Sequence, residues 1–340
     1  MTDDAGGPRG LPAGHRPFRP TPATPIRWPD AFGRRFTLFC DVEEEFDWRA
    51  PLDPGQRATT AMRAFPAAHR RFAEAGAGLT CMVDHPVATD PVAVDLLAEA
   101  AAHPRSAIGA QLHAWVTPPS AAPVTPFTSY QGNLPTALEA AKIAALTAAL
   151  TAAFDAPPRA FRAGRYGLGP ATLGLLRDAG YRLDSSVRAG YDYRADGGPD
   201  FRALGNAAWR DDGVVELPLT TIHTGLARHG GRALYRALGA VPFGRGLAAR
   251  AGLIQRVALT PEDMPLAAAL QAIDVAVQDG ERLLAFSFHS PSLVPGFTPY
   301  VRDEDDLAAF WRWWNAVLER LAARGYAHAS LTEVLAAAGA

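Results

Sequence analysis

The fold of this chain is decided at residues 36–42, FTLFCDV, where a mostly apolar run of strand length ends next to an acidic residue. Two similar runs follow, GLTCMVD at 78–84 and SAIGAQL at 106–112, and a helical pattern separates each run from the next. Short apolar runs that alternate with helices are typical of a parallel sheet covered by crossover helices. We therefore predict an α/β fold.

The alternation continues to the C-terminus. Further strands are predicted within RAFRAG, YRLDSSV, GVVELPLT and ERLLAFSFH, and a last short one at 326–329. Helices are predicted at 58–75, 90–102, 135–154, 169–180 and 303–323, and a last helix is predicted to begin near Ser330. Seven or eight such units in about 300 residues favour a closed or nearly closed barrel. A doubly wound sheet is the alternative, but its Gly-rich phosphate loop is missing.

Composition excludes several classes of protein. The 340 residues carry 33 Lys+Arg against 35 Asp+Glu, and this net charge of −2 gives no general attraction to nucleic acid. A hydrophobic fraction of 48% is too high for a disordered chain. The sequence contains no apolar run of about 18 residues, so we expect no transmembrane segment. The first residues lack the apolar core of a secretory signal, so we expect no signal peptide. We expect a cytoplasmic protein with a flexible Pro/Gly/Arg-rich arm at 1–30 and one domain at 31–340.

Polar side chains follow all the predicted strands except the last. In a parallel barrel these carboxyl ends meet at one rim, where the chemistry of such folds takes place. The residues at this rim are Asp41, Glu43, Asp84, His113, Arg162, Tyr166, Asp184, Glu216 and His289. A barrel built only for stability has no reason to collect them there.

The order of these motifs resembles a known family. FTLFCDVEEEFDW, IGAQLHAWVTPP, FRAGRYG, LDSSV and FSFHSPSL follow the order of the signatures of NodB-like polysaccharide deacetylases. The first motif is similar to that of a subgroup with D-V-E in place of D-D. The resemblance spans about residues 35–335. It implies a deformed (β/α) barrel of seven or eight units that hydrolyses an N-acetyl group, usually on an amino sugar.

The resemblance also implies roles for single residues. Asp41 matches the base that deprotonates the attacking water, and Arg162 matches the arginine that pairs with that base. His289 matches the acid that protonates the leaving amine. His113 matches the first metal-binding histidine, and Trp115 matches the aromatic residue often found between the two metal histidines; we take Trp115 as a candidate substrate contact.

The metal positions depart from the family pattern. Val42 stands where the second Asp is expected, and Thr117 stands where the second His is expected. His113, Glu43 and Asp84 remain as candidate ligands, whereas catalytic zinc ordinarily takes three protein ligands and one open position. This set predicts one divalent ion, zinc or cobalt, that is weakly held or absent.

Two alternatives to a metal-dependent deacetylase stay open. Some relatives hydrolyse small cyclic amides without metal, and here Arg162, backbone N–H groups and Tyr166 would then stabilise the oxyanion. A catalytically inactive carbohydrate-binding barrel is the other alternative, and the degraded metal positions favour it. The joint presence of Asp41, Arg162 and His289 favours an enzyme.

Residues 217–261 form an Arg-rich insertion that the family signature does not explain. It contains six arginines and no Asp or Glu. A solvated insertion is the simplest interpretation. The functional interpretation is a lid in which Arg232 and Arg236 bind an anionic group of the substrate, a phosphate or a uronate. A lipid-phosphate carrier at the inner membrane surface would also fit. Asp184 and Phe297 are further candidates for contacts to a small saccharide, and the oligomeric state is left open.

Overall fold

The computed structural model describes residues 11, 12 and 14–339. Its main sheet has the strand order β1-β7-β8-β6-β5-β4-β3-β2-β11, and β12 pairs with the first residues of β2. The strands are β1 (Thr24–Pro25), β2 (Arg34–Val42), β3 (Thr80–Val83), β4 (Ala107–Leu112), β5 (Ala160–Ala163), β6 (Leu183–Asp184), β7 (Trp209–Asp211), β8 (Val214–Glu216), β11 (Leu283–His289) and β12 (Tyr326–His328).

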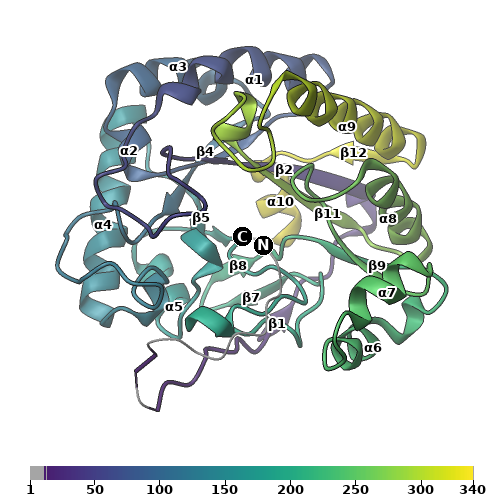
Figure 1. The fold of residues 1–340 in the computed structure, drawn as a ribbon. Helices are drawn as coiled ribbons and strands as arrows, with labels where there is room; N and C mark the ends of the chain where they lie inside the picture. Colours follow the sequence, from purple (N-terminus) through teal and green to yellow (C-terminus); the bar gives the residue numbers. More distant parts are fainter. Residues whose placement is uncertain (1–10, 13, 340) are drawn as a thin grey trace.

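The sheet is parallel from β11 through β8 and curls into a barrel (Figure 1). Only β7 and β1, at one edge, run antiparallel to their neighbours. Across the gap between β8 and β11, the Thr220 amide donates to the Ala285 carbonyl at 3.2 Å. The Ser287 amide likewise donates to the Leu259 carbonyl at 3.2 Å. The predicted α/β barrel is thus confirmed, and single hydrogen bonds complete its wall.

Helices surround the sheet (Figure 1). They are α1 (Phe65–Glu74), α2 (His85–Ala88), α3 (Pro91–Ala102), α4 (Thr136–Phe154), α5 (Thr172–Asp178), α8 (Leu266–Gln278), α9 (Glu304–Ala323) and α10 (Leu331–Ala338). Side-chain caps begin several of them: Asp90 accepts from the Val92 amide, and Ser330 forms a capping box with Glu333. Such caps satisfy amides that the helix leaves unpaired, so the predicted starts at 90 and 330 agree with the structure.

Aromatic side chains fill the space between the sheet and α9. Phe288 of β11 packs against Phe72 with ring centroids 5.5 Å apart, and against Trp314 at the same separation. All three side chains are buried. Cys40 and Cys81 are buried and free, as expected of small core residues, although they are register partners in adjacent strands. Burial raises the pKa of Cys81 to about 12.

One described helix, α4, is long and apolar enough to cross a membrane. Here it lies in the barrel wall, where it contacts α2 and β4. Its buried Lys142 donates to the carbonyl of Pro119 at 2.9 Å, and its buried Glu139 accepts from Thr172 at 2.5 Å. These polar contacts tie α4 to the barrel.

The expected arm and insertion have defined positions. Residues 1–10 and 13 of the arm lie outside the described residues. Within 14–30, β1 pairs with β7 and Arg19 binds Asp200 at 2.8 Å, so this part lies on the barrel rather than free of it. The insertion contains β9 (Thr221–Thr224), α6 (Gly231–Leu238), α7 (Gly244–Arg250) and β10 (Gln255–Ala258), and β9 and β10 form an antiparallel pair.

Candidate active site

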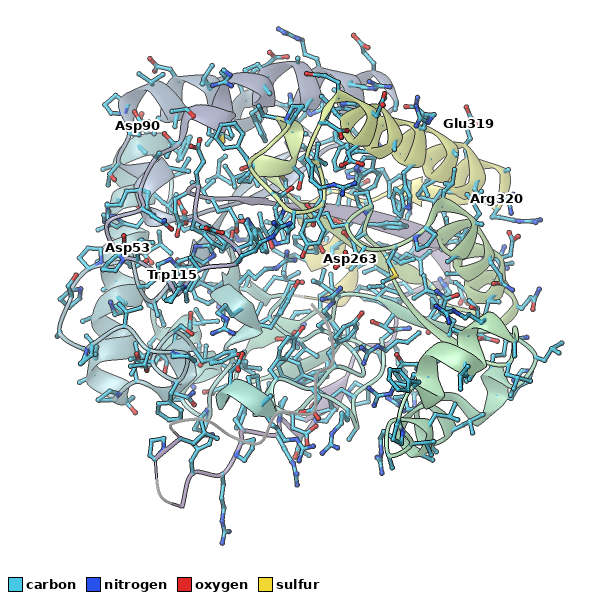
Figure 2. The ribbon with its side chains drawn as sticks, in the orientation of Figure 1. Asp53, Asp90, Trp115, Asp263, Glu319 and Arg320 are labelled. Atoms are coloured by element: carbon cyan, nitrogen blue, oxygen red, sulfur yellow. The ribbon has the colours of Figure 1, made fainter. Side chains whose placement is uncertain are left out.

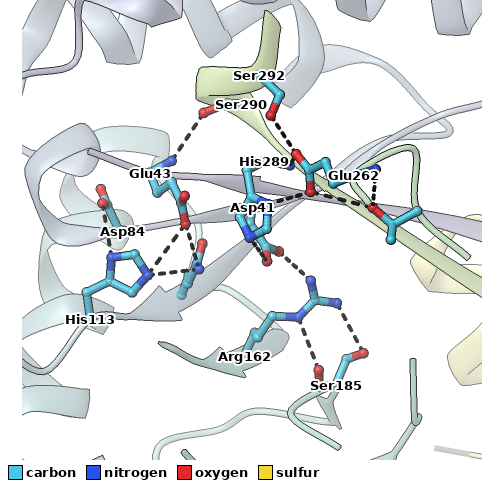
Figure 3. A network of polar contacts seen from close by, with 12 residues as sticks. Asp41, Glu43, Asp84, His113, Arg162, Ser185, Glu262, His289, Ser290 and Ser292 are labelled. Atoms are coloured by element: carbon cyan, nitrogen blue, oxygen red, sulfur yellow. Dashed lines mark hydrogen bonds and ion pairs between the residues drawn. The ribbon is translucent and has the colours of Figure 1, made fainter. Parts of the chain in front are cut away.

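Asp41 and Arg162 form a buried ion pair at the carboxyl end of the barrel (Figure 3). Asp41 comes from β2 and Arg162 from β5, and their side chains are 3% and 1% exposed. An unpaired charge at this depth would be very costly, so each group stabilises the other in its ionised form. The pair therefore keeps a carboxylate available at the rim.

The guanidinium of Arg162 is held on three sides. Its Nη1 donates to Asp41, and its Nε and Nη2 donate to the carbonyl and hydroxyl oxygens of Ser185 at 3.1 and 3.2 Å. Phe39 lies beneath it, with its ring centroid 4.7 Å from Cζ. A guanidinium fixed in this way orients its carboxylate partner with little conformational freedom.

His289 lies beside Asp41 because β11 and β2 are in parallel register with these two residues paired. Its Nε2 is 3.8 Å from Oδ2 of Asp41, and its Nδ1 is 2.6 Å from Oε2 of Glu262. Glu262 also accepts from the His289 amide and from the Ser292 hydroxyl. Burial disfavours the imidazolium, but the negative charge of Glu262, its hydrogen bond to the ring and the charge of Asp41 outweigh burial and raise the pKa of His289 well above its usual range. His289 is thus protonated on the nitrogen that faces Asp41.

Glu262 is absent from the predicted site. It lies four residues after the end of β10, in RVALTPED, and it is the first acidic residue after the insertion. The rule that polar residues follow the strands would have found it if β10 had been recognised as a strand. Only the fold shows that this residue lies beside His289, 27 positions away.

A second buried group surrounds His113, which follows β4. Its Nδ1 is 2.7 Å from Oε2 of Glu44 and 3.9 Å from Oδ2 of Asp84. Trp115 donates from Nε1 to the other oxygen of Glu44 at 2.8 Å, and its ring stacks on the imidazole with centroids 4.2 Å apart. Burial lowers the pKa of His113 even though Glu43, Asp84 and Asp41 oppose this effect. The imidazole is therefore neutral, the form that binds metals.

The two carboxylates of the predicted metal site lie beside different ring nitrogens of His113. Glu43 lies near Nε2 of His113, at 3.5 Å, whereas Asp84 lies near Nδ1. The lone-pair directions of the two ring nitrogens diverge, so one ion on His113 cannot take both carboxylates in this arrangement. Glu44 replaces Glu43: ligand atoms of Glu44, Asp84 and His113 all lie within 4.8 Å of one another.

One imidazole and two carboxylates fit a divalent ion in the number and kind of ligands. Burial raises the pKa of Glu44 and of Asp84, and a cation would relieve the cost of their negative charge. All four of their carboxylate oxygens already accept hydrogen bonds, from Trp115, His113, Val87 and the Glu44 amide. The three residues therefore fit a divalent ion by the chemistry of their ligand atoms, but an ion that binds there would have to replace some of these hydrogen bonds.

Glu43 stands between the two groups. Its Oε2 accepts from Gln111 at 3.1 Å, whereas its Oε1 is buried without a hydrogen-bond partner among the described residues. Burial raises the pKa of Glu43 to about 8, against the opposing effects of His289 and His113. A buried oxygen without a partner next to Asp41 and His113 marks a place where a polar ligand is favoured.

The predicted substrate contacts lie in different surroundings. Asp184 is completely buried; it accepts from Ser186 at 2.6 Å and does not face solvent. Tyr166 is partly exposed, and the guanidinium of Arg188 lies over its ring at 5.5 Å. Phe297 is partly exposed beneath Arg63 at 5.8 Å. Tyr166 and Phe297 thus remain accessible, whereas Asp184 is placed to support neighbouring groups.

Arg232 and Arg236 lie on α6, away from the Asp41–His289 pair. They line a narrow pocket with residues of the loop after β6, among them Gly190, Asp192 and Arg202. Asp41, Arg162 and His289 do not line this pocket. The structure brings together the predicted catalytic residues but not these two arginines.

Aromatic side chains cover His289. Trp48 contacts the imidazole with ring centroids 5.0 Å apart and contacts Tyr300 at 5.6 Å. Phe46 stacks on Trp48 at 4.8 Å. Partly exposed rings next to a catalytic pair offer apolar faces to a sugar. Trp48 and Phe46 follow the first strand motif, which was the signal available in the sequence.

A cleft of about 560 Å³ opens beside Trp115. The loop at 51–54, the segment that follows Trp115, and Lys142 contribute to its walls. Figure 2 shows Trp115 and Asp263 inside the ring of helices, whereas Glu319 and Arg320 lie on its outer side. The cleft therefore adjoins the buried group around His113.

Known structures share this architecture. A protein from Mycobacterium smegmatis assigned as a polysaccharide deacetylase superimposes over 93% of both chains with a TM-score of 0.51 and 16% identity. The fold is that of a deacetylase-type (β/α) barrel. A 4-alpha-glucanotransferase from Thermococcus litoralis also matches, over 89% of this chain and 40% of its own, with a TM-score of 0.50 and 11% identity.

A family 4 carbohydrate esterase from Streptomyces lividans, solved with acetate, covers 87% of this chain and 91% of its own, at 14% identity and a TM-score of 0.39. No protein-family profile and no curated protein sequence matches the chain. At these identities the likeness concerns the fold, because one barrel serves several chemistries. Function has to be argued from the site.

Proposed function

We propose that this protein is a hydrolase that removes an acyl group, most simply acetyl, from the nitrogen of an amino sugar. The observation that carries the proposal is the placement of Asp41 between Arg162 and His289 at the barrel rim. Amide hydrolysis needs a base for water and an acid for the departing nitrogen. The ionised Asp41 and the protonated His289 supply both.

The proposed reaction begins when Asp41 takes a proton from water while the water oxygen adds to the amide carbon. The C–N bond of the resulting tetrahedral species then breaks as His289 gives its Nε2 proton to the nitrogen. The products are the free carboxylic acid and the amine. Asp41 is left protonated and His289 neutral, and a proton moving between them, 3.8 Å apart, restores the starting state.

The loop after β5 is the best candidate for oxyanion stabilisation. Arg165 and Tyr166 are consecutive non-glycine residues with φ of 53° and 60°. Such conformations are costly and cluster at functional sites, where they aim backbone groups. The loop is also held tightly against His113, since a Cβ on Gly164 would lie 2.5 Å from its Cδ2. A divalent ion on Glu44, Asp84 and His113 would supply Lewis-acid polarisation of the carbonyl.

A second candidate is metal-independent hydrolysis of a small cyclic amide. The observation that favours it is the set of hydrogen bonds that already engages each oxygen of Glu44 and Asp84. Treatment with a chelator separates the two candidates. Loss of activity that added zinc or cobalt restores supports the metal-dependent deacetylase, whereas unchanged activity supports the cyclic-amide hydrolase.

The primary test measures acetate release from N-acetylated amino sugars and from neutral and anionic oligosaccharides that contain them. Asp41→Asn should lower kcat by about 10²- to 10⁴-fold while sugar binding, followed by ligand-observed NMR, is retained. Asp305→Asn, at an exposed site on α9, is the matched control and should leave kcat unchanged. Sugar binding without turnover by the unmodified protein would contradict the proposal and indicate a binding barrel.

A further inference from the structure

The insertion at 217–261 exposes an unusual amount of apolar surface. Five of its large apolar side chains project into solvent: Leu226 is 85% exposed, Val241 56%, Phe243 87%, Leu247 61% and Leu253 45%. Among the other described residues, only Val92 on α3 is a comparably exposed large hydrophobic residue. Contiguous apolar surface of this kind marks interaction sites.

These side chains belong to backbone segments that are hydrogen-bonded to one another around α7, and we call this group of five residues the apolar ridge. Phe243 is the residue before α7, and its carbonyl accepts from the amide of Leu247, one turn into that helix, at 2.9 Å. The amide of Leu253 bonds to the carbonyl of Ala248 on the same helix, and that of Leu226 bonds to the carbonyl of Gly252. Figure 1 shows α6 and α7 projecting from the barrel beside β9, far from α3. The ridge therefore stands out from the body of the protein.

Phe243 is held in a costly conformation. Its φ is 57°, in the left-handed region that bulky residues rarely adopt. Its ring is nevertheless 87% exposed, so packing within the chain does not compensate for the strain. Strain of this kind persists where it has a function. The conformation leaves an exposed aromatic ring at the start of α7.

The charged residues of the insertion itself all have one sign. Residues 217–261 contain six arginines and no Asp or Glu. Arg228 is paired with Asp279 at 2.7 Å, and Arg256 lies over the ring of Tyr191 at 3.6 Å. Three others, Arg232, Arg236 and Arg250, are exposed. The insertion that carries the ridge thus also carries three solvent-exposed arginines.

We propose that the insertion docks the protein on an anionic lipid bilayer. Exposed apolar side chains insert at the boundary between headgroups and acyl chains, while neighbouring arginines bind lipid phosphates. Charge complementarity favours a bilayer over a second copy of this chain, because copies would bring the same arginines together without acids from either insertion. This proposal is independent of the catalytic assignment, since none of the residues that carry it belongs to the active site.

The test is flotation of the full chain with vesicles of phosphatidylcholine, alone or with about 30% phosphatidylglycerol, a strongly anionic surface. We expect binding to the anionic vesicles and weakening at about 0.5 M NaCl, where charges are screened. Phe243→Asn with Leu247→Asn should weaken binding by roughly tenfold or more. Asn tolerates a left-handed conformation, so this variant should remain folded.

Arg236→Glu with Arg250→Glu should weaken binding by at least about 25-fold, since one arginine near such a surface contributes about fivefold. The matched controls are Val92→Asn and Arg312→Glu, which change an exposed apolar residue and an exposed arginine elsewhere, and both should bind normally.

Three results would overturn the proposal. The first is absence of binding to the anionic vesicles, and the second is equal binding to phosphatidylcholine alone. The third is a concentration-dependent dimer, seen by light scattering, that the Phe243→Asn and Leu247→Asn variant abolishes while vesicle binding persists. That outcome would assign the apolar ridge to contact between copies.

Discussion

Replacement of Glu262 by Gln isolates the role of the buried partner of His289. The substitution keeps the size of the side chain and an oxygen that can accept from the His289 amide and from Ser292. It removes the negative charge 2.6 Å from Nδ1 of the imidazole. The change therefore acts on the protonation of His289 more than on packing.

The magnitude follows from that contact. A hydrogen bond to a charged group contributes roughly 1.5–3 kcal/mol, and one pKa unit corresponds to about 1.36 kcal/mol. The pKa of His289 should thus fall by about one to two units in Glu262→Gln. His289 acts as an acid, so kcat/KM of the unmodified protein should fall as the pH rises through its raised pKa. In the variant this decline should begin about one to two units lower.

Two assays follow the change. The first is kcat/KM for acetate release against pH, and the second is NMR titration of the His289 Cε1 proton, assigned with His289→Asn. His229→Asn, at an exposed site, is the control for the spectra. A titration of His289 that does not move, or a loss of activity equal at every pH, would refute the assigned role of Glu262.

The free energy of unfolding should also depend on the protonation of His289. A histidine whose pKa is raised in the folded state stabilises the protein below its unfolded pKa of about 6.5. That contribution is lost as the pH rises through the raised folded value. Urea unfolding should therefore show a larger loss for Glu262→Gln at about pH 6 than above the folded pKa of His289.

The remaining predictions concern the neighbouring loops. Gly164→Ala should lower the free energy of unfolding by about 1–3 kcal/mol in urea, because its Cβ would lie 2.5 Å from the His113 ring. Glu44→Gln should weaken zinc binding, measured by calorimetry on chelator-treated protein, by about 10- to 100-fold, and Glu43→Gln should weaken it less. Ser330→Ala should cost about 1 kcal/mol in urea unfolding, since it removes a capping box.

Each of these has a control and a contrary outcome. Gly246→Ala meets no atom within 4 Å and should be neutral or slightly stabilising, so equal losses at positions 164 and 246 would contradict the steric argument. Equal effects of the substitutions at 43 and 44 on zinc binding would contradict the assignment of Glu44, rather than Glu43, as a metal ligand. Ser330→Asp retains a capping oxygen, and a loss as large as that of Ser330→Ala would argue against the cap.

Sequence alone determined much of this molecule because its signals are local. Apolar runs of strand length, helical periodicity and caps such as Asp90 require only neighbouring residues, and they predicted the barrel. The rule that polar residues follow parallel strands placed Asp41, Arg162 and His289 at one rim. The resemblance implied that Asp41 pairs with Arg162, and the structure brings these two residues together across 121 positions. The parallel register of β2 and β11 places His289 beside Asp41.

Tertiary structure alone decided which groups act together. Glu43 and Glu44 are adjacent in sequence and chemically identical, yet one lies near Nε2 of His113 and the other near Nδ1. Successive side chains of an extended chain point to opposite sides, so their neighbours depend on how β2 and β4 are placed in the sheet. Glu262 likewise gains its role only because β10 ends beside β11. The physical reason is the same in both cases. Spacing in the sequence fixes which side of its own strand a side chain points to, whereas the residues that it contacts depend on which other segments the fold places on that side.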